Sequence, residues 1–377
     1  MLFLVYLLML VVQGMFFLIQ TGKGDTRNNT AITTAFFTQS AKSDTAYPDI
    51  FFIMPDCYPS SAYQMEMLNY DNHYFDSVLL AKGFYVASAS KSNYNRTQFS
   101  IPSTLDMEYL TAIDTSFSSK ALEYFKALKK AENNSLIAFL KKIDYQFINL
   151  SIFDLNTIPA FTKEYFIRAS ENDIIFNNTF LGCYKRDISW KFFQTDANKD
   201  ALFFSPEMIA EYKTYKEHNR KVIDSLRKIT DSGENNGSPK MVYAHLYLPH
   251  YPYFYTADGK AYPDDELYRV SAYTDKSMFK AYIQYSNTKL LEVIERIERA
   301  DKKKNTIIIL QSDHGFDDID TSRPGDAFRN YKAVYFPDRN YKALYDSMSN
   351  VNTFRVVLNK YFHQHLPMLK DSSFYMP

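Results

Sequence analysis

Short apolar runs alternate with longer stretches along most of the chain. The runs are rich in β-branched and aromatic residues and have the length of single strands, which predicts buried β-strands. They lie at residues 48–54, 83–88, 145–150, 305–311 and 331–337, with one more beginning at Lys240. Helices are predicted at 134–142, 207–228, 273–300 and 352–362. This alternation predicts an α/β fold with a mostly parallel central sheet sandwiched by helices, and the last run is a candidate edge strand.

The first residues of the chain form a separate apolar segment. Residues 2–19 are almost wholly apolar and the first charge is Lys23, a length that suits a membrane span. Neither a basic region nor a small-residue cleavage site is evident, which favours a retained anchor over a signal peptide. We expect one transmembrane helix at residues 1–22, either alone or as the last span of a longer membrane domain. A polar linker at 23–47 and one α/β domain at 48–377 should follow.

Composition excludes some classes of function. The chain has 43 basic and 43 acidic residues and no basic stripe, so we expect no nucleic-acid partner. Two cysteines do not make a disulfide framework, and pairing of Cys57 with Cys183 stays open. The 31 tyrosines and 31 phenylalanines are expected in the core and on the surface, with a lipid-facing or glycan-binding role as the alternative.

Candidate metal ligands follow two of the predicted strands. The run at 305–311 leads into Ser312-Asp313-His314-Gly315, and the run at 48–54 leads into Pro55-Asp56. Open α/β sheets bind ligands at the carboxyl ends of their strands, so these acids and the imidazole are placed to meet. Together they suit zinc or manganese. For the tetrapeptide alone, a polar strand-to-loop turn is an equally good interpretation.

A threonine hydroxyl is predicted at the start of a helix. Thr97 follows the run at 83–88, and the apolar residues after it suggest a turn into a helix. A helix N-terminus supplies positive dipole potential and free N–H groups. That environment stabilises an alkoxide and an anionic substrate.

These motifs, in this order, resemble the alkaline phosphatase and sulfatase superfamily. The closer likeness is to its membrane-anchored branch, the lipoteichoic acid synthase-like and phosphoethanolamine transferase-like enzymes, and it runs from about residue 49 to 362. In that branch an acid after the first strand, a threonine nucleophile and a late Asp-His pair hold one metal. The resemblance therefore implies that Asp56, Thr97, Asp313 and His314 are metal ligands and that Thr97 is the catalytic nucleophile.

A histidine-rich loop agrees with this resemblance. The strand that begins at Lys240 leads into a His-x-x-x-x-His pair and prolines. Relatives carry a similar loop whose imidazoles contact the transferred phosphate or sulfate, which implies substrate binding by His250 and His245. A satisfied core histidine is the alternative for His245. Arg96 is a further candidate for the anion, with a solvated side chain as the equal alternative.

Two features depart from other parts of the superfamily. Two-metal relatives carry an acid on the helix before the last metal strand, but residues 284–288 contain none. One divalent metal ion is therefore expected, zinc or manganese before magnesium or calcium. Formylglycine sulfatases mature a Cys or Ser in C/S-x-P-x-R, whereas the segment from Cys57 to Ser61 lacks the arginine. Threonine cannot become formylglycine, so arylsulfatase chemistry of the usual kind is disfavoured.

The resemblance implies a membrane-anchored, metal-dependent enzyme whose catalytic domain faces the periplasm or the cell exterior. We expect transfer of phosphoglycerol or phosphoethanolamine to an envelope glycan or lipid through a phospho-threonine at Thr97. The partners would be the membrane and an anionic lipid or glycan substrate, and the oligomeric state is open. Hydrolysis of a phosphate or sulfate ester is one alternative, and a non-catalytic envelope scaffold of the same fold is another.

Overall fold

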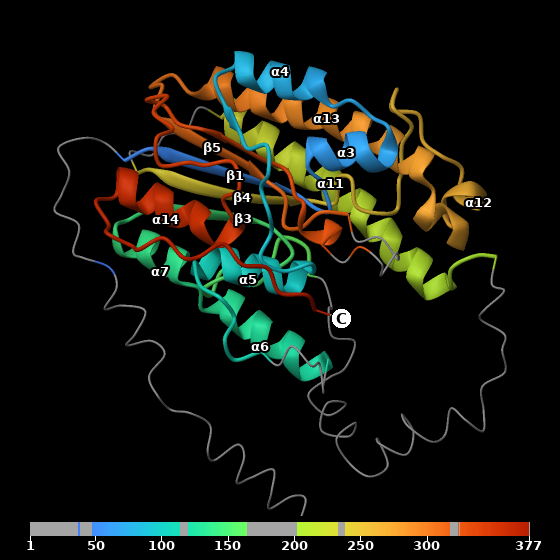
Figure 1. Ribbon diagram of the computed structural model, residues 1–377, viewed down its shortest axis with the longest axis horizontal. Coiled ribbons are helices and arrows are strands. Elements are labelled where there is room, and N and C mark those ends of the chain that lie inside the picture. The colour runs from blue at the N-terminus through green and yellow to red at the C-terminus, as the bar shows by residue number, and fades with distance from the viewer. Residues whose placement is uncertain are drawn as a thin grey trace, which may run out of the picture. The chain divides into compact units, whose positions relative to one another are not determined.

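One six-stranded sheet forms the centre of the computed structural model (Figure 1). The structure describes residues 37, 47–113, 120–163, 202–232, 238–316, 323 and 325–376. Along the chain the strands are β1 (Asp49–Pro55), β2 (Tyr85–Val86), β3 (Gln146–Leu150), β4 (Lys240–Leu246), β5 (Thr306–Gln311) and β6 (Lys332–Tyr335). Their order across the sheet is β2-β6-β5-β1-β4-β3. Every run predicted to be a strand is confirmed as one.

The sheet is mixed rather than mostly parallel, so this part of the fold prediction was wrong. β1 is parallel to β4 and β5, and β3 is parallel to β4. β6, however, is antiparallel to both of its neighbours, β5 and β2. The described part of the connection between β5 and β6 contains only the short 3-10 helix η3 (Asp326–Phe328) and no crossover helix. A strand that returns without a crossover pairs antiparallel. Because β2 pairs with its other side, β6 lies inside the sheet rather than at the expected edge.

Helices cover both faces of the sheet (Figure 1). One layer contains α3 (Ser61–Leu68), α4 (His73–Ala81), α11 (Pro206–Asp231) and α13 (Lys276–Ala300). The other contains α5 (Thr97–Asp106), α6 (Lys120–Glu132), α7 (Ser135–Lys142) and α14 (Asn350–Tyr361). The short α12 (Asp264–Leu267) and η2 (Val270–Thr274) precede α13. The predicted sandwich of helices is therefore confirmed, and α7, α11, α13 and α14 match the predicted helical stretches.

The central strand β1 explains why the apolar runs are continuous. It lies between β4 and β5, and its residues from Ile50 to Pro55 are buried. Phe52 stacks on Tyr243 of β4 with ring centroids 5.1 Å apart, and it meets Phe354 of α14 edge-on at 5.0 Å. A strand covered by helices on both faces needs apolar side chains on both. Polar side chains are therefore expected where the strand ends, which is where Asp56 stands.

The described residues do not include the predicted membrane anchor. None of the helices in the described ranges is long and apolar enough to cross a membrane. The expected anchor at residues 1–22 and most of the linker at 23–47 lie outside the described residues, so they stay predictions. The strands and helices described above belong to one compact unit, formed by residues 40–166 and 199–377.

Candidate active site

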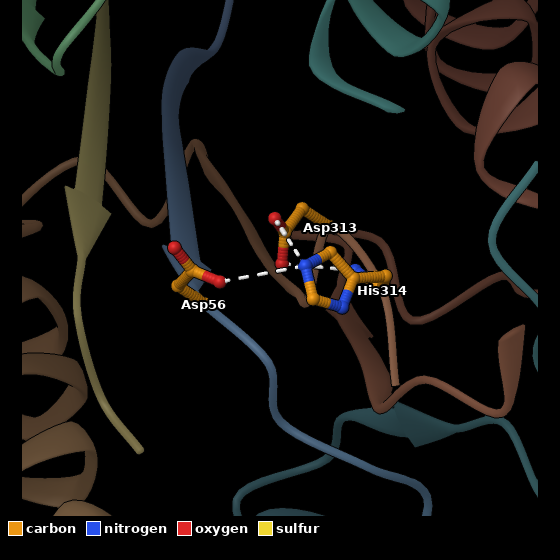
Figure 2. Close-up of side chains that lie close together, drawn as sticks. All are labelled: Asp56, Asp313 and His314. Atoms are coloured by element: carbon orange, nitrogen blue, oxygen red, sulfur yellow. Dashed lines mark hydrogen bonds and ion pairs between the residues drawn. The ribbon is translucent and has the colours of Figure 1, made fainter. Parts of the chain in front are cut away.

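Two carboxylates and an imidazole meet where β1 and β5 end. Because these strands are parallel neighbours, Asp56 after β1 lies beside Asp313 and His314 after β5. One ligand atom from each of the three residues lies within 4.8 Å of the others, and all three residues are buried (Figure 2). The structure therefore brings together the three residues that the sequence marked as metal ligands.

Backbone N–H groups hold the carboxylate of Asp313. Its Oδ1 accepts hydrogen bonds from the N–H of Cys57 at 3.1 Å and from the N–H of His314 at 2.9 Å. Its Oδ2 accepts one from the hydroxyl of Thr97 at 2.7 Å. Burial and the negative charge of Asp56 raise the pKa of Asp313. Two carboxylates this close repel each other unless a cation lies between them.

The ring of His314 turns one nitrogen toward the cluster. Its Nδ1 lies 2.7 Å from the carbonyl oxygen of Gly315, so it donates its proton there. Its Nε2 lies 3.5 Å from Oδ2 of Asp313 and 3.7 Å from Oδ1 of Asp56. Burial by itself lowers the pKa of His314, but Asp313 and the other groups around the ring raise it well above its usual value. A backbone carbonyl on one ring nitrogen is the usual support for a metal-binding imidazole.

One oxygen of Asp56 fits a bound cation. Oδ2 lies 3.1 Å from Nε2 of His245, whereas the buried Oδ1 has no hydrogen-bond partner among the described residues. Burial raises the pKa of Asp56, but the imidazoles of His250, His245 and His314 hold it at about 2. A buried, ionised oxygen without a donor is unfavourable unless a cation compensates it. Asp56, Asp313 and His314 together therefore form a site that can hold a divalent metal ion.

Thr97 is the first residue of α5 and faces this cluster. Its Oγ1 lies 2.7 Å from Oδ2 of Asp313 and 3.3 Å from Nε2 of His314. Arg96, in an extended conformation, precedes the helix as its N-cap. The hydroxyl thus sits in the positive potential of a helix N-terminus, as the sequence predicted.

A cavity of about 170 Å³ opens beside Thr97 and His314. Besides these two residues, its lining contains the polar side chains of Arg96, Gln98 and His250, the thiol-bearing Cys57, and six aromatic rings, Tyr124, Tyr251, Tyr253, Tyr273, Phe279 and Phe316. The basic side chains suit an anionic group next to the hydroxyl. The structure therefore places Arg96 and His250 where a substrate contact requires them, and their roles stay predictions.

His245 lies elsewhere. It belongs to β4, is fully buried, and is not among the residues that line the cavity. Its ring nitrogen Nε2 forms a hydrogen bond with the Asp56 carboxylate. Its backbone carbonyl accepts a hydrogen bond from His218 of α11. This geometry gives no support to the predicted substrate contact of His245. His245 is buried, as the alternative of a core histidine requires, but its Nδ1 has no hydrogen-bond partner among the described residues, so it is not a fully satisfied one.

Two supporting residues escaped the sequence analysis. The hydroxyl of Ser100 and the amide of Asn350 both donate to the backbone carbonyl of Asp313, at 2.5 Å and 3.2 Å. Ser100 could have been found, because it lies one helical turn after Thr97 on the same face of α5. Asn350 could not, because it is distant in the sequence and lies in no motif. Cys183 lies outside the described residues, so its pairing with Cys57 is not tested.

The fold and this cluster define an α/β protein with a buried site that can hold a divalent metal ion beside a cavity. The chain belongs to the sulfatase family, whose family model, described as Sulfatase, matches residues 48–356. It is therefore an enzyme of the sulfatase superfamily, as the resemblance implied, and its chemistry at the family level is that of a transferase or hydrolase. The alternative of a non-catalytic scaffold is set aside.

Solved structures with a similar fold are domains of phosphoethanolamine transferases and related enzymes. The C-terminal periplasmic domain of EptC from Escherichia coli, in complex with zinc, is 10% identical over 85% of this chain and 84% of its own, with a TM-score of 0.50. A second structure of that domain is 11% identical over 88% of this chain and 89% of its own, with the same TM-score of 0.50.

An integral membrane protein is also similar in fold. Lipooligosaccharide phosphoethanolamine transferase A from Neisseria meningitidis is 11% identical over 85% of this chain and 56% of its own, with a TM-score of 0.50. At such identities these likenesses show the fold alone. No curated protein matches the chain.

Proposed function

We propose that this enzyme transfers a phospho-head group, phosphoglycerol or phosphoethanolamine, from a lipid donor to an envelope glycan or lipid. One observation carries the proposal: the hydroxyl of Thr97 lies 2.7 Å from Asp313 and 3.3 Å from His314, at a helix N-terminus that faces a cavity. The position suits a nucleophile that forms a covalent adduct.

Asp56, Asp313, His314 and the oxygen of Thr97 would hold one divalent metal ion, which would lower the pKa of the hydroxyl and polarise the ester. Two carboxylates and one imidazole suit zinc or manganese better than magnesium or calcium. The zinc complex of the EptC domain supports zinc.

The chain's own residues then carry two displacement steps. In the first, the Thr97 hydroxyl loses its proton as its oxygen bonds to phosphorus, the bond from phosphorus to the lipid oxygen breaks, and the lipid leaves as an alcohol that takes up that proton. In the second, the acceptor hydroxyl loses its proton as its oxygen bonds to phosphorus, and the bond from phosphorus to the Thr97 oxygen breaks, so that Thr97 regains its proton. His250, Arg96 and the first N–H groups of α5 would stabilise the phosphoryl oxygens, a role supported by the position of both side chains in the cavity lining.

We further propose that residues 1–22 anchor the enzyme in a membrane and that the catalytic domain faces the periplasm or the cell exterior. The apolar sequence of residues 2–19 supports the anchor. The periplasmic location named for the EptC domain of similar fold supports the orientation. The substrate would then be an anionic lipid or glycan at the membrane surface.

Intact mass spectrometry tests the proposal. After incubation with total membrane lipids, the wild-type chain should gain the mass of one head group, and Thr97→Ala should gain nothing. Addition of an acceptor glycan or lipid should remove the added mass and label the acceptor. A wild-type chain that carries no adduct under any donor, although it is folded and metal-loaded, would contradict the proposal.

Hydrolysis of a phosphate or sulfate ester is the second candidate, favoured by the match to the Sulfatase family. It uses the same Thr97 adduct, with water in place of the acceptor. Release of free head group at the same rate with and without acceptor would select hydrolysis over transfer.

A further inference from the structure

An extended segment at residues 366–376, here called the strap, is held by asparagine side chains. Three asparagines each use both ends of the side-chain amide to pair with the backbone N–H and C=O of a single strap residue. Asn359 pairs with Leu366 at 2.7 and 2.8 Å, and Asn352 pairs with Leu369 at 2.9 and 2.8 Å. Asn95 pairs with Met376 at 2.7 and 3.1 Å. Figure 1 shows this segment as a red trace that runs from α14 past α5.

The far end of the strap lies along the loop that precedes the nucleophile. The hydroxyl of Ser373 donates to the carbonyl of Ser92 at 2.7 Å, and the N–H of Phe374 donates to the carbonyl of Asn93 at 2.8 Å. The side chain of Asn93 donates to the carbonyl of Ser372 at 2.8 Å. With the Asn95 pair, these hydrogen bonds join the strap to Ser92, Asn93 and Asn95, three of the five residues immediately before Thr97.

Apolar contacts fix the same end. Met376 is fully buried in a cluster with Tyr94, Phe99, Leu110 and Ala127. Tyr94 belongs to the loop, and Phe99 lies on α5 just after Thr97. The ring of Phe374 stacks on that of Tyr94 with centroids 5.7 Å apart. The strap thus buries side chains against both the loop and the helix that position the nucleophile.

The same framework reaches the backbone of Asp313, the residue whose carboxylate faces Thr97. The side-chain oxygen of Asn93 accepts a hydrogen bond from the N–H of Val351 at 2.7 Å, at the start of α14. The neighbouring Asn350 donates to the backbone carbonyl of Asp313 at 3.2 Å. Loop, strap and α14 are therefore one hydrogen-bonded unit that sets the place of Thr97 relative to Asp313.

We propose that the strap is a positioning element of the active site and that Asn95 is its positioning residue. Asn95 touches neither the cavity nor the metal ligands, but its two hydrogen bonds to Met376 hold the loop two residues before Thr97. A displacement of about 1 Å at a reacting group can lower a rate by about 100-fold. The inference rests on the proposed role of Thr97 as the nucleophile.

Asn95→Ala and Asn359→Ala make a matched pair for the test, because each removes two hydrogen bonds to one strap residue and only the first lies near Thr97. Both variants are compared with the wild type in the metal-loaded full chain. Turnover of the chromogenic diester bis(p-nitrophenyl) phosphate, bound metal, melting temperature and hydrogen exchange of amides 92–100 are measured. We expect Asn95→Ala to lower kcat about tenfold or more with KM and metal content retained, and to raise exchange in the loop. Asn359→Ala should lower the melting temperature while keeping kcat within about twofold.

The proposal is overturned if Asn95→Ala leaves kcat and loop exchange at their wild-type values, or if both variants lower kcat to the same extent. If Asn95→Ala does not fold, Asn95→Asp takes its place, since it keeps the acceptor for the Met376 N–H and loses the donor to its carbonyl. A wild-type chain that turns over no ester would defeat the proposed function. Hydrogen exchange of amides 92–100 would then still test whether Asn95 holds the loop, because this measurement needs no substrate.

Discussion

The imidazole of His245 donates a hydrogen bond to the carboxylate of Asp56, with 3.1 Å between Nε2 and Oδ2. Both side chains are buried. His245 reaches Asp56 from strand β4 and does not line the cavity. It fixes the orientation of the carboxylate, so that Oδ1 faces Asp313 and His314. His245 therefore influences the metal site without being able to reach a substrate in the cavity.

His245→Phe should weaken metal binding. The change keeps an aromatic ring but removes the donor to Asp56, and loss of such a supporting partner lowers metal affinity by about 10–100-fold. His245→Gln retains an N–H donor and should recover part of the affinity. Competition with a chromophoric chelator measures it. His250→Ala is the control, since His250 lines the cavity, and it should alter turnover with little loss of metal. An equal loss of affinity in both variants would show that the contact with Asp56 is not decisive.

Asp313→Ala and His314→Ala should purify largely free of metal. Each removes one member of a cluster whose ligand atoms all lie within 4.8 Å of one another. Elemental analysis of the wild type under non-chelating conditions should find a single tightly bound transition metal ion per chain. No metal in the wild type would contradict the metal-dependent mechanism. Two ions per chain would reveal a second ligand set that the described residues do not contain.

Metal binding should also depend on pH. Asp313 and neighbouring groups raise the pKa of the buried His314 well above its usual value in the metal-free protein. A metal ion must displace that proton, so binding releases a proton and the affinity should rise with pH. Proton release measured in weakly and strongly buffered calorimetric titrations checks this. An affinity that is the same at acidic and alkaline pH would be the contrary result.

Thr97→Ala should lower turnover by several orders of magnitude while the fold survives. The change removes the attacking oxygen but little volume, and loss of a nucleophile leaves only positioning and electrostatic stabilisation. Thr97→Ser keeps the hydroxyl and should retain partial activity. Cys57→Ala is the control, because the hydrogen bond from residue 57 to Asp313 comes from the backbone. Activity that depends on Cys57 and not on Thr97 would point back to sulfatase-type chemistry.

Lys332→Met should stabilise the protein at and below neutral pH. Lys332 is buried in β6, and burial lowers its pKa from 10.5 to about 7, against the opposing charge of Asp371. Between these two pH values the unfolded chain binds the proton and the folded chain does not, so the free energy of unfolding of the wild type rises with pH across this window. Below it both states are protonated, and the full penalty of burying the charge remains.

The variant lacks this titration, so its advantage should be largest below about pH 7 and should shrink toward pH 10.5. We expect an advantage of a few kcal/mol, reduced by the lost hydrogen bond from Lys332 to the carbonyl of Met348. Urea unfolding of both proteins on either side of the window measures it. A difference that does not vary with pH would show that Lys332 titrates normally.

The site was largely predictable, for a reason visible in β1. A strand buried on both faces carries apolar residues to its end, so Asp56 at the end of β1 marks the ligand edge. Contacts between residues that are far apart in the sequence leave no comparable sequence pattern. Nothing near Asn95 indicates its pairing with Met376. Period-2 alternation cannot assign the ring of His245 to a face, because β4 is buried on both faces from Met241 to Leu246. α3 was missed because it buries the polar Gln64 beside Tyr63 and Leu68, so polarity does not mark its inner face.

The interior position of β6 leaves a very short strand at one edge of the sheet. Because β6 is interior, the sheet ends at β2, which consists only of Tyr85 and Val86. Long, exposed edge strands invite pairing with another chain, and natural proteins limit that risk with very short ones. So short an edge leaves few unpaired backbone groups on which a second molecule could add a strand. The short edge strand β2 thus limits edge-to-edge pairing at this side of the sheet.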